Sequence, residues 1–223
     1  MRHIVCISDT HGLHDQVTVP AGDVLVHCGD TVGVNSLTEI TGFLEWFENQ
    51  PHPVKLYCAG NHDGIYERFP KEARKMVARY APSVRYLEEE SIEVGGFKWF
   101  FSPYTPTFFD WYFMADRGSQ INSKWEKIPK ETQVLITHGP PYGVLDLVPS
   151  DYVNGNQDRH QGCSDLRATI DSRLSALKLH VFGHLHSQGG EMININGVIY
   201  VNAAICDERY KPTRQPRIIS LDD

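Results

Sequence analysis

Five short polar segments, each at the end of an apolar run, carry the side chains that could do chemistry in this sequence. They combine carboxylates, imidazoles and one amide. In chain order they are Ser8-Asp9-Thr10-His11-Gly12, Cys28-Gly29-Asp30, Cys58-Ala59-Gly60-Asn61-His62-Asp63, Thr137-His138-Gly139 and Gly183-His184-Leu185-His186. One such segment could arise by chance, but five in succession indicate a shared metal site.

The ligand types indicate which ions could bind. Imidazole, carboxylate and amide oxygen without thiolate suit Mn, Fe, Zn or Ni, and suit Ca less well. The candidates are too many for one four-coordinate zinc, and they fit two ions about 3.5–4 Å apart, bridged by one carboxylate and a water. A bridging water that loses its proton near neutral pH becomes a nucleophile for in-line attack on phosphorus. The segments therefore predict two-metal phosphoester chemistry.

Short apolar runs must position these segments, and their length and β-branched residues predict buried strands. The expected strands are His3 to Ser8, Asp23 to Cys28, Val54 to Cys58, Val134 to Thr137 and Leu179 to Phe182. Between the second and third, Ser36 is placed as the N-cap of a helix, with Glu39 at the capping-box position. Strand, helix and strand form a βαβ unit, which predicts a parallel sheet that binds ligands beyond its carboxyl ends.

The pattern changes after the third strand, which predicts a second sheet within one domain of residues 1–223. The expected additional elements are helices Pro70 to Tyr80 and Cys163 to Leu177, a hairpin of Glu88 to Val94 with Phe97 to Ser102, and strands Glu191 to Ile195, Val198 to Asn202 and Arg217 to Leu221. Two sheets with helices outside them indicate an α/β sandwich.

Composition places the chain among soluble globular proteins, with 223 residues, 41% hydrophobic and 22% charged. The net charge of -7 argues against binding an extended nucleic acid. No apolar stretch nears the ~18 residues of a membrane span. The 5 cysteines include no Cys-x-x-Cys pair, and Met1 to Val5 runs into a strand without a leader, so we expect a cytoplasmic protein.

The five segments resemble, in the same order, the five blocks of the calcineurin-like metallophosphoesterases. That resemblance implies a four-layer αββα sandwich of two mixed sheets flanked by helices. It also implies two divalent metal ions, with Mn²⁺ expected and Fe, Zn, Ni or Mg as alternatives. The implied ligands are Asp9, His11 and His186 for the first ion, Asp30 as the bridge, and Asn61, His138 and His184 for the second.

The resemblance also implies the catalytic roles in the third segment. His62 would contact the phosphate together with Asn61, and would protonate the leaving alkoxide as the general acid. Protein phosphatases of this superfamily carry a further Asp after the Gly-Asp block, which orients this histidine, whereas this chain has Thr31-Val32-Gly33. Asp63 could take that duty, but adjacency in sequence does not establish the hydrogen bond, so its role stays open.

A second group of motifs resembles the metallophosphoesterase-domain-containing branch, which contains phosphodiesterases, some of them acting on cyclic nucleotides. These motifs are Ser102-Pro103-Tyr104-x-Pro106, Phe109-Asp110-Trp111, His138-Gly139-Pro140-Pro141, Gly162-Cys163 and Asn202-Ala203. Some members of this branch carry Gly at the position of His184, which weakens one metal site. This chain has the histidine, so its implied ligand set is complete. We therefore expect a two-metal phosphodiesterase that hydrolyses small or cyclic-nucleotide-like phosphodiesters through a metal-bridging hydroxide. The alternatives are a phosphomonoesterase or protein Ser/Thr phosphatase, and a non-catalytic metal-binding interaction protein.

Substrate choice is expected to depend on two loops, Tyr104 to Asp116 and Tyr142 to Gln161. The aromatic-rich stretch from Phe97 to Phe113 overlaps the first of them. We interpret this stretch as core or as a homodimer interface rather than as a platform for a nucleobase, because stacking requires exposed ring faces.

Overall fold

One sheet of the structure contains the first three predicted strands. It has the order β13-β1-β2-β3-β4. The strands are β1 (Arg2–Ile7), β2 (Val24–His27), β3 (Val54–Tyr57), β4 (Val84–Tyr86) and β13 (Arg217–Leu221). Strands β1 to β4 run parallel, and β13 pairs antiparallel with β1. The computed structural model describes residues 2–153 and 158–222.

The second sheet has the order β11-β12-β10-β9-β6-β5, with antiparallel pairs at both edges and parallel pairs between them. Its strands are β5 (Glu90–Val94), β6 (Phe97–Ser102), β9 (Val134–Thr137), β10 (Leu179–Phe182), β11 (Met192–Ile195) and β12 (Val198–Asn202). The short strands β7 (Thr105–Pro106) and β8 (Met114–Ala115) pair separately. The predicted hairpin is confirmed as β5 and β6.

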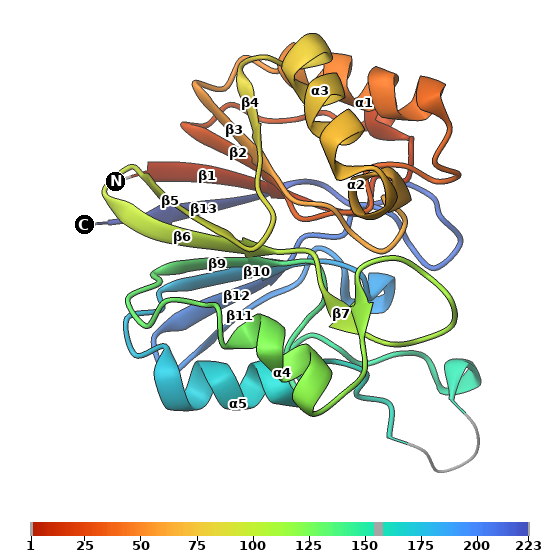
Figure 1. The fold of residues 1–223 in the computed structure, drawn as a ribbon. Helices are drawn as coiled ribbons and strands as arrows, with labels where there is room; N and C mark the ends of the chain where they lie inside the picture. Colours follow the sequence, from red (N-terminus) through yellow and green to blue (C-terminus); the bar gives the residue numbers. More distant parts are fainter. Residues whose placement is uncertain (1, 154–157, 223) are drawn as a thin grey trace.

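Helices cover the outer face of each sheet, as Figure 1 shows. They are α1 (Leu37–Glu48), α2 (Gly64–Arg68) and α3 (Pro70–Tyr80) on the first sheet, and α4 (Ser119–Trp125) and α5 (Ser164–Arg173) on the second. The described residues also form 3-10 turns at His14–Gln16, Ser150–Tyr152 and His186–Gln188. The predicted capping box of α1 is present, because the Glu39 amide donates to Ser36 Oγ and the Ser36 amide donates to Glu39 Oε2.

Alternate residues of the central strands point into different apolar layers, because successive strand side chains face opposite sides of a sheet. Cys6 and Val26 pack between the two sheets, whereas Val5 and Leu25 pack under α1 and α3. A third layer lies under α4 and α5. This arrangement confirms the four-layer αββα sandwich and explains why the strands read as continuous apolar runs.

The structure departs from the sequence expectation mainly at short elements. The helix predicted from Cys163 to Leu177 begins one residue later and ends at Arg173, because the backbone of Leu174 leaves the helical region. Helices α2 and α4 and strands β4, β7 and β8 were not predicted, since each is too short to show a hydrophobic period. Within residues 2–153 and 158–222, no helix is long and apolar enough to cross a membrane.

Candidate metal centre

The turns after β1, β2 and β10 hold predicted ligand residues in the left-handed backbone region. The φ angles are 53° for Asp9, 44° for His11, 55° for Asp30 and 66° for His184. Non-glycine residues are uncommon at positive φ, and they persist there when surrounding contacts fix them. Backbone hydrogen bonds provide such contacts, from Asp9 to Gly29 O (2.9 Å) and from His11 to Asp30 O (3.0 Å). These bonds join the turn after β1 to the turn after β2, so each turn supports the other.

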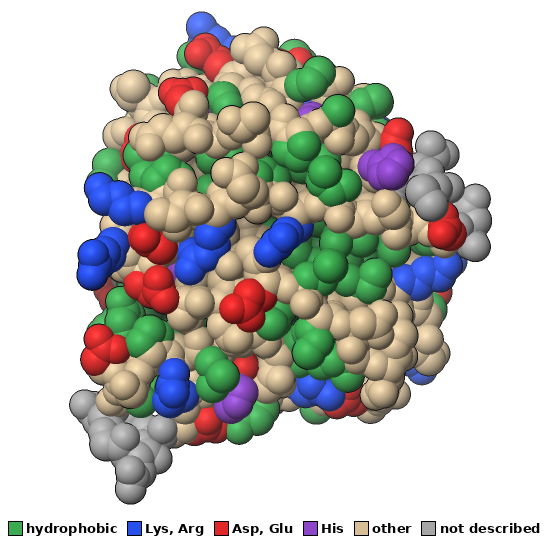
Figure 2. All heavy atoms as spheres, turned by 180° about the vertical axis from the view of Figure 1, so that it is seen from behind, with side chains coloured by type: hydrophobic (Ala, Val, Ile, Leu, Met, Phe, Trp, Pro, Cys, Tyr) green, Lys and Arg blue, Asp and Glu red, His purple; other side chains and the backbone are tan. Residues whose placement is uncertain are grey.

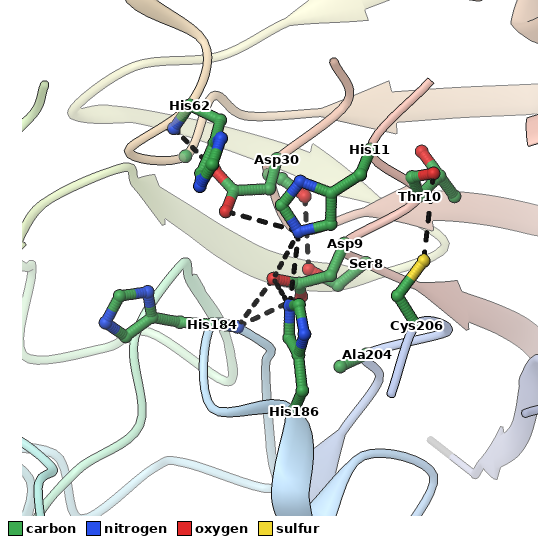
Figure 3. Close-up of polar contacts among 12 residues, drawn as sticks. Ser8, Asp9, Thr10, His11, Asp30, His62, His184, His186, Ala204 and Cys206 are labelled. Carbon is green, nitrogen blue, oxygen red and sulfur yellow. Dashed lines mark hydrogen bonds and ion pairs between the residues drawn. The ribbon is translucent and has the colours of Figure 1, made fainter. Parts of the chain in front are cut away.

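The first ligand cluster joins Asp9, His11 and His186, from opposite sheets of the sandwich. His186 Nε2 lies 3.2 Å from Asp9 Oδ1 and 3.2 Å from His11 Nε2. Figure 3 shows the three side chains pointing toward one another. The other nitrogen of His186, Nδ1, donates to Asp207 O at 2.9 Å. That bond leaves the Nε2 lone pair toward Asp9, the usual arrangement of a metal-binding histidine.

The second ligand cluster joins Asp30, His138 and His184. His138 Nε2 lies 3.3 Å from Asp30 Oδ2 and 2.9 Å from Asn61 Oδ1. His138 Nδ1 donates to Cys28 O at 3.0 Å, so its Nε2 also faces the cluster. Imidazole nitrogen, carboxylate oxygen and amide oxygen thus lie together here, a donor set that fits a divalent transition metal.

Asp30 lies between the two clusters. Its Oδ2 is 3.3 Å from His138 Nε2 in one cluster and 3.8 Å from His11 Nε2 in the other. Its Oδ1 accepts a hydrogen bond from the His62 amide at 2.7 Å, which fixes the carboxylate. This position is the one that a bridging ligand requires.

Two glycines leave the space that the carboxylate and imidazole ligands occupy. A Cβ atom at Gly183 would overlap the carboxylate of Asp9 and the side chain of Ser8. At Gly29, a Cβ atom would lie 2.6 Å from His138 Nδ1, and the φ of +109° is unfavourable for any other residue. Close approach of the five turns therefore depends on these glycines.

The charges of the two carboxylates dominate the electrostatics of the centre. Burial by itself would lower the pKa of His138, but Asp30 and Asp9 raise that pKa to about 9. Burial by itself would raise the pKa of Asp9, but the hydrogen bond and charge of His186 and the charge of His138 hold it below its usual range. The carboxylates are thus ionised at neutral pH and create a negative potential that favours bound cations.

The histidines His11 and His184 behave differently from His138. Burial lowers the pKa of His11 to about 4 and the pKa of His184 to about 3. Both rings are therefore neutral at physiological pH and can each offer a lone pair to a cation.

We expect the affinity for Mn²⁺ to fall as the pH is lowered from about 9. The pKa of His138 is raised to about 9, so below that pH a cation must displace its proton. Each displaced proton changes the apparent affinity by about tenfold per pH unit. Calorimetric titrations with Mn²⁺ at several pH values, in buffers of different ionisation enthalpy, measure both the affinity and the protons released. An affinity independent of pH between 6 and 9 would contradict this assignment.

His62 lies beside both clusters. Its Nδ1 is 3.3 Å from Gly33 O, to which it donates, so Nε2 is the ring nitrogen left for a substrate. His62 also falls within ligand distance of His11 and Asp30. Its position suits either a metal ligand or an acid, and removing the imidazole distinguishes the two roles.

The structure gives Asp63 a different duty from the orientation of His62. Its carboxylate accepts hydrogen bonds from Thr31 Oγ1 (2.6 Å), the Thr31 amide (3.0 Å) and the Gly60 amide (2.8 Å). Asp63 therefore joins the turn after β2 to the turn after β3, while the acceptor for the imidazole of His62 is Gly33 O. Sequence adjacency could not reveal this, because the neighbouring side chains point in different directions.

The ligand clusters face a cavity of about 420 Å³, part of whose wall was not predicted. The lining includes His11, Asp30, Asn61, His62, His184 and His186, together with Phe108, Phe109, Arg117, Tyr152, Glu208 and Tyr210. No motif marked Arg117, Glu208 or Tyr210 in the sequence.

Of the two interpretations of the aromatic stretch, core or homodimer interface, core holds for its first half but not for Phe108 and Phe109, and an interface stays a prediction. Trp99 and Phe101 are buried between the sheets. Phe108 and Phe109, by contrast, are 44% and 82% exposed and line the cavity. The loop between β7 and β8 carries them out of the sheet, which a dense aromatic run in the sequence does not reveal. Of the other expected substrate loop, residues 154–157 lie outside the described part.

An αββα sandwich with two ligand clusters joined by one carboxylate at its strand ends defines the metallophosphoesterase class. The chain belongs to the calcineurin-like phosphoesterase family, whose sequence model matches residues 2–188. This family implies a metal-dependent phosphoester hydrolase, and its members typically bind two divalent metals.

Curated relatives match the chain over most of its length. It is 36% identical to Metallophosphoesterase domain-containing protein 1 of Homo sapiens, over 97% of this chain and 70% of that protein. It is 34% identical to UPF0046 protein K07C11.7 of Caenorhabditis elegans, over 98% of this chain and 74% of that protein. The crystal structure of TT1561 of Thermus thermophilus shares the fold, with a TM-score of 0.59 at 14% identity over 90% of this chain and 88% of that one.

Proposed function

We propose that this protein is a two-metal phosphodiesterase acting on small or cyclic-nucleotide-like phosphodiesters, with Mn²⁺ as its metal. The observation that carries the proposal is the position of Asp30 between the two ligand clusters, grouped with His11 on one side and with His138 and His184 on the other, in the wall of one cavity beside His62. A shared carboxylate between two cations is the arrangement that in-line phosphoryl transfer uses.

The residues around the centre have distinct duties in this reaction. Bound divalent cations would activate water and offset the charge on the phosphoryl oxygens. Asn61 and His62 border the cavity where the phosphate would lie. As the bond between phosphorus and the leaving oxygen breaks, His62 Nε2 gives its proton to that oxygen, so that an alcohol and not an alkoxide departs.

The cavity supports a small substrate with a flat apolar group. Its volume of about 420 Å³ falls in the range of about 300–1,000 Å³ typical of ligand pockets. Phe108, Phe109, Tyr152 and Tyr210 supply exposed rings at its wall, and such rings can stack on a nucleobase. This wall is the reason to favour a nucleoside phosphodiester over a phosphoprotein.

The net charge of the chain, and the mixed charges on one of its faces, favour a small substrate over an extended nucleic acid. On the face seen in Figure 2, basic and acidic side chains are interspersed, and apolar side chains lie between them. The whole chain has a net charge of -7, whereas tracking a polyphosphate backbone favours a basic stripe.

The test is turnover by metal-stripped protein with and without added metal. We expect no hydrolysis of bis(p-nitrophenyl) phosphate after chelation, and recovery with Mn²⁺ but much less with Ca²⁺, which the ligand set suits poorly. A panel of 2′,3′- and 3′,5′-cyclic nucleotides, linear diesters, p-nitrophenyl phosphate and phosphopeptides then ranks the substrates. Faster turnover of the monoesters would replace the proposal by a phosphomonoesterase. Absence of turnover with every metal, while metal binds, would leave a metal-binding interaction protein.

A further inference from the structure

Trp111 packs against the proposed general acid. Its ring centroid lies 4.2 Å from that of His62, and the two planes are inclined by only 32°. The ring of His11 also contacts the imidazole, with a centroid distance of 4.7 Å and an interplanar angle of 82°. Trp111 itself offers no metal ligand, so its contact with His62 is a ring contact and not part of a ligand set.

The loop that carries Trp111 is tied to the same turn as His62. The Tyr112 amide donates to Asn61 O at 3.2 Å, and the Phe113 amide donates to Glu67 Oε1 at 3.1 Å. The absence of a side chain at Gly64 leaves room for the ring of Tyr112, which a Cβ atom would overlap. The indole and imidazole are thus held by a common support, although Trp111 is 38% exposed.

The hydrogen bond to His62 does not fix its ring by itself. Gly33 O is a neutral acceptor, and the distance of 3.3 Å from Nδ1 is long for a hydrogen bond. Rotation about the terminal torsion of histidine is soft, so this hydrogen bond alone leaves the ring plane poorly defined. An aromatic ring stacked on the imidazole restricts that rotation.

We infer that Trp111 is a positioning residue that holds the His62 imidazole in the plane from which Nε2 protonates the leaving oxygen. This inference rests on the proposed function. In the step concerned, hydroxide forms a bond to phosphorus and the bond from phosphorus to the leaving oxygen breaks. The proton moves from His62 Nε2 to that oxygen, the alcohol departs, and the imidazole is left neutral.

A positioning role predicts an effect that depends on the leaving group. A phenolate that departs readily needs little protonation, whereas a poor leaving group depends on the general acid. Loss of the correct ring plane should therefore slow the reaction of poor leaving groups selectively. A purely structural role for Trp111 would slow all diesters alike.

The experiment compares Trp111→Leu and Trp111→Phe with the wild type on methyl p-nitrophenyl phosphate and methyl phenyl phosphate, with Mn²⁺ present. For Trp111→Leu we expect kcat on the phenyl ester to fall about 10- to 30-fold, with a change of less than about twofold on the p-nitrophenyl ester. Trp111→Phe should recover most of this loss, because it restores a stacked ring. KM and bound metal should stay unchanged, and Phe69→Leu, at an exposed aromatic residue at the start of α3, is the matched control.

Two further measurements distinguish a positioning role of Trp111 from a purely structural one. In a His62→Ala background, Trp111→Leu should have no additional effect on kcat, because the group that it positions is absent. In proton NMR spectra of the metal-free chain, the His62 ring signals should shift in Trp111→Leu, since they lose the ring current of the indole. Unshifted signals, or equal slowing of both esters by an active Trp111→Leu variant, would overturn the positioning role alone. A wild type inactive on both esters would overturn the proposed function and this role with it.

Discussion

Asp30→Asn should lower kcat/KM for a phosphodiester at least about 10³-fold, on the order of 4 kcal/mol of transition-state stabilisation. The carboxylate of Asp30 lies between the two ligand clusters, 3.3 Å from His138 Nε2 and 3.8 Å from His11 Nε2. The substitution removes one negative charge from both sites but keeps the shape of the side chain. The amide oxygen of asparagine can still accept the hydrogen bond from the His62 amide, so the turn should persist.

Metal content measured beside activity makes this prediction specific. We expect the variant to retain less than the full complement of metal after gel filtration, as quantified by elemental analysis. The matched control is Asp171→Asn, the same chemical change at an exposed carboxylate that pairs with Arg167 on α5. An Asp30→Asn protein that keeps both its metal content and a tenth of its activity would exclude Asp30 as the bridge.

His62→Ala should lower kcat by about 10² to 10⁴-fold on a diester with a poor leaving group, while metal content stays unchanged. The physical reason is the loss of a proton donor next to the leaving oxygen rather than the loss of a ligand. The Nδ1 atom of His62 is engaged with Gly33 O, which leaves a single nitrogen toward the cavity. An aryl diester with a good leaving group should be affected less.

The same variant decides between the two roles that the distances around His62 allow. If His62→Ala releases metal from the protein, His62 is a ligand in the group with His11 and Asp30, and the general acid must be sought elsewhere. His3→Ala, at an exposed histidine on β1 that contacts Ser220, controls for removing an imidazole. Turnover unchanged with both kinds of leaving group would refute the catalytic role of His62.

Much of the centre could be predicted from the sequence, because the ligands follow directly after buried strands. In a parallel sheet the carboxyl ends of neighbouring strands lie at one edge, so Asp9 and Asp30 had to lie close together. His138 and His184 follow parallel strands of the second sheet in the same way. Only the packing of the two sheets face to face brings these two groups of ligands to one place.

The spacing of apolar residues along the chain predicted the main strands and the longer helices. Helices α1 and α3, for example, each bury apolar residues along one face. Short elements such as α2 and β7 were missed, because a single turn or a two-residue strand has no period. Their placement nevertheless matters for function. The loop between β7 and β8 presents Phe108 and Phe109 to the cavity.

By itself the sequence determined the layer order and the kinds of atoms offered to a metal, because both depend on residue type and on spacing along the chain. Only the tertiary structure decided that Asp63 holds the Thr31 turn and that Gly33 O and Trp111 contact the ring of His62. Those contacts join segments 29 to 49 positions apart in the chain. Side-chain direction and loop packing, which no local pattern encodes, bring them together.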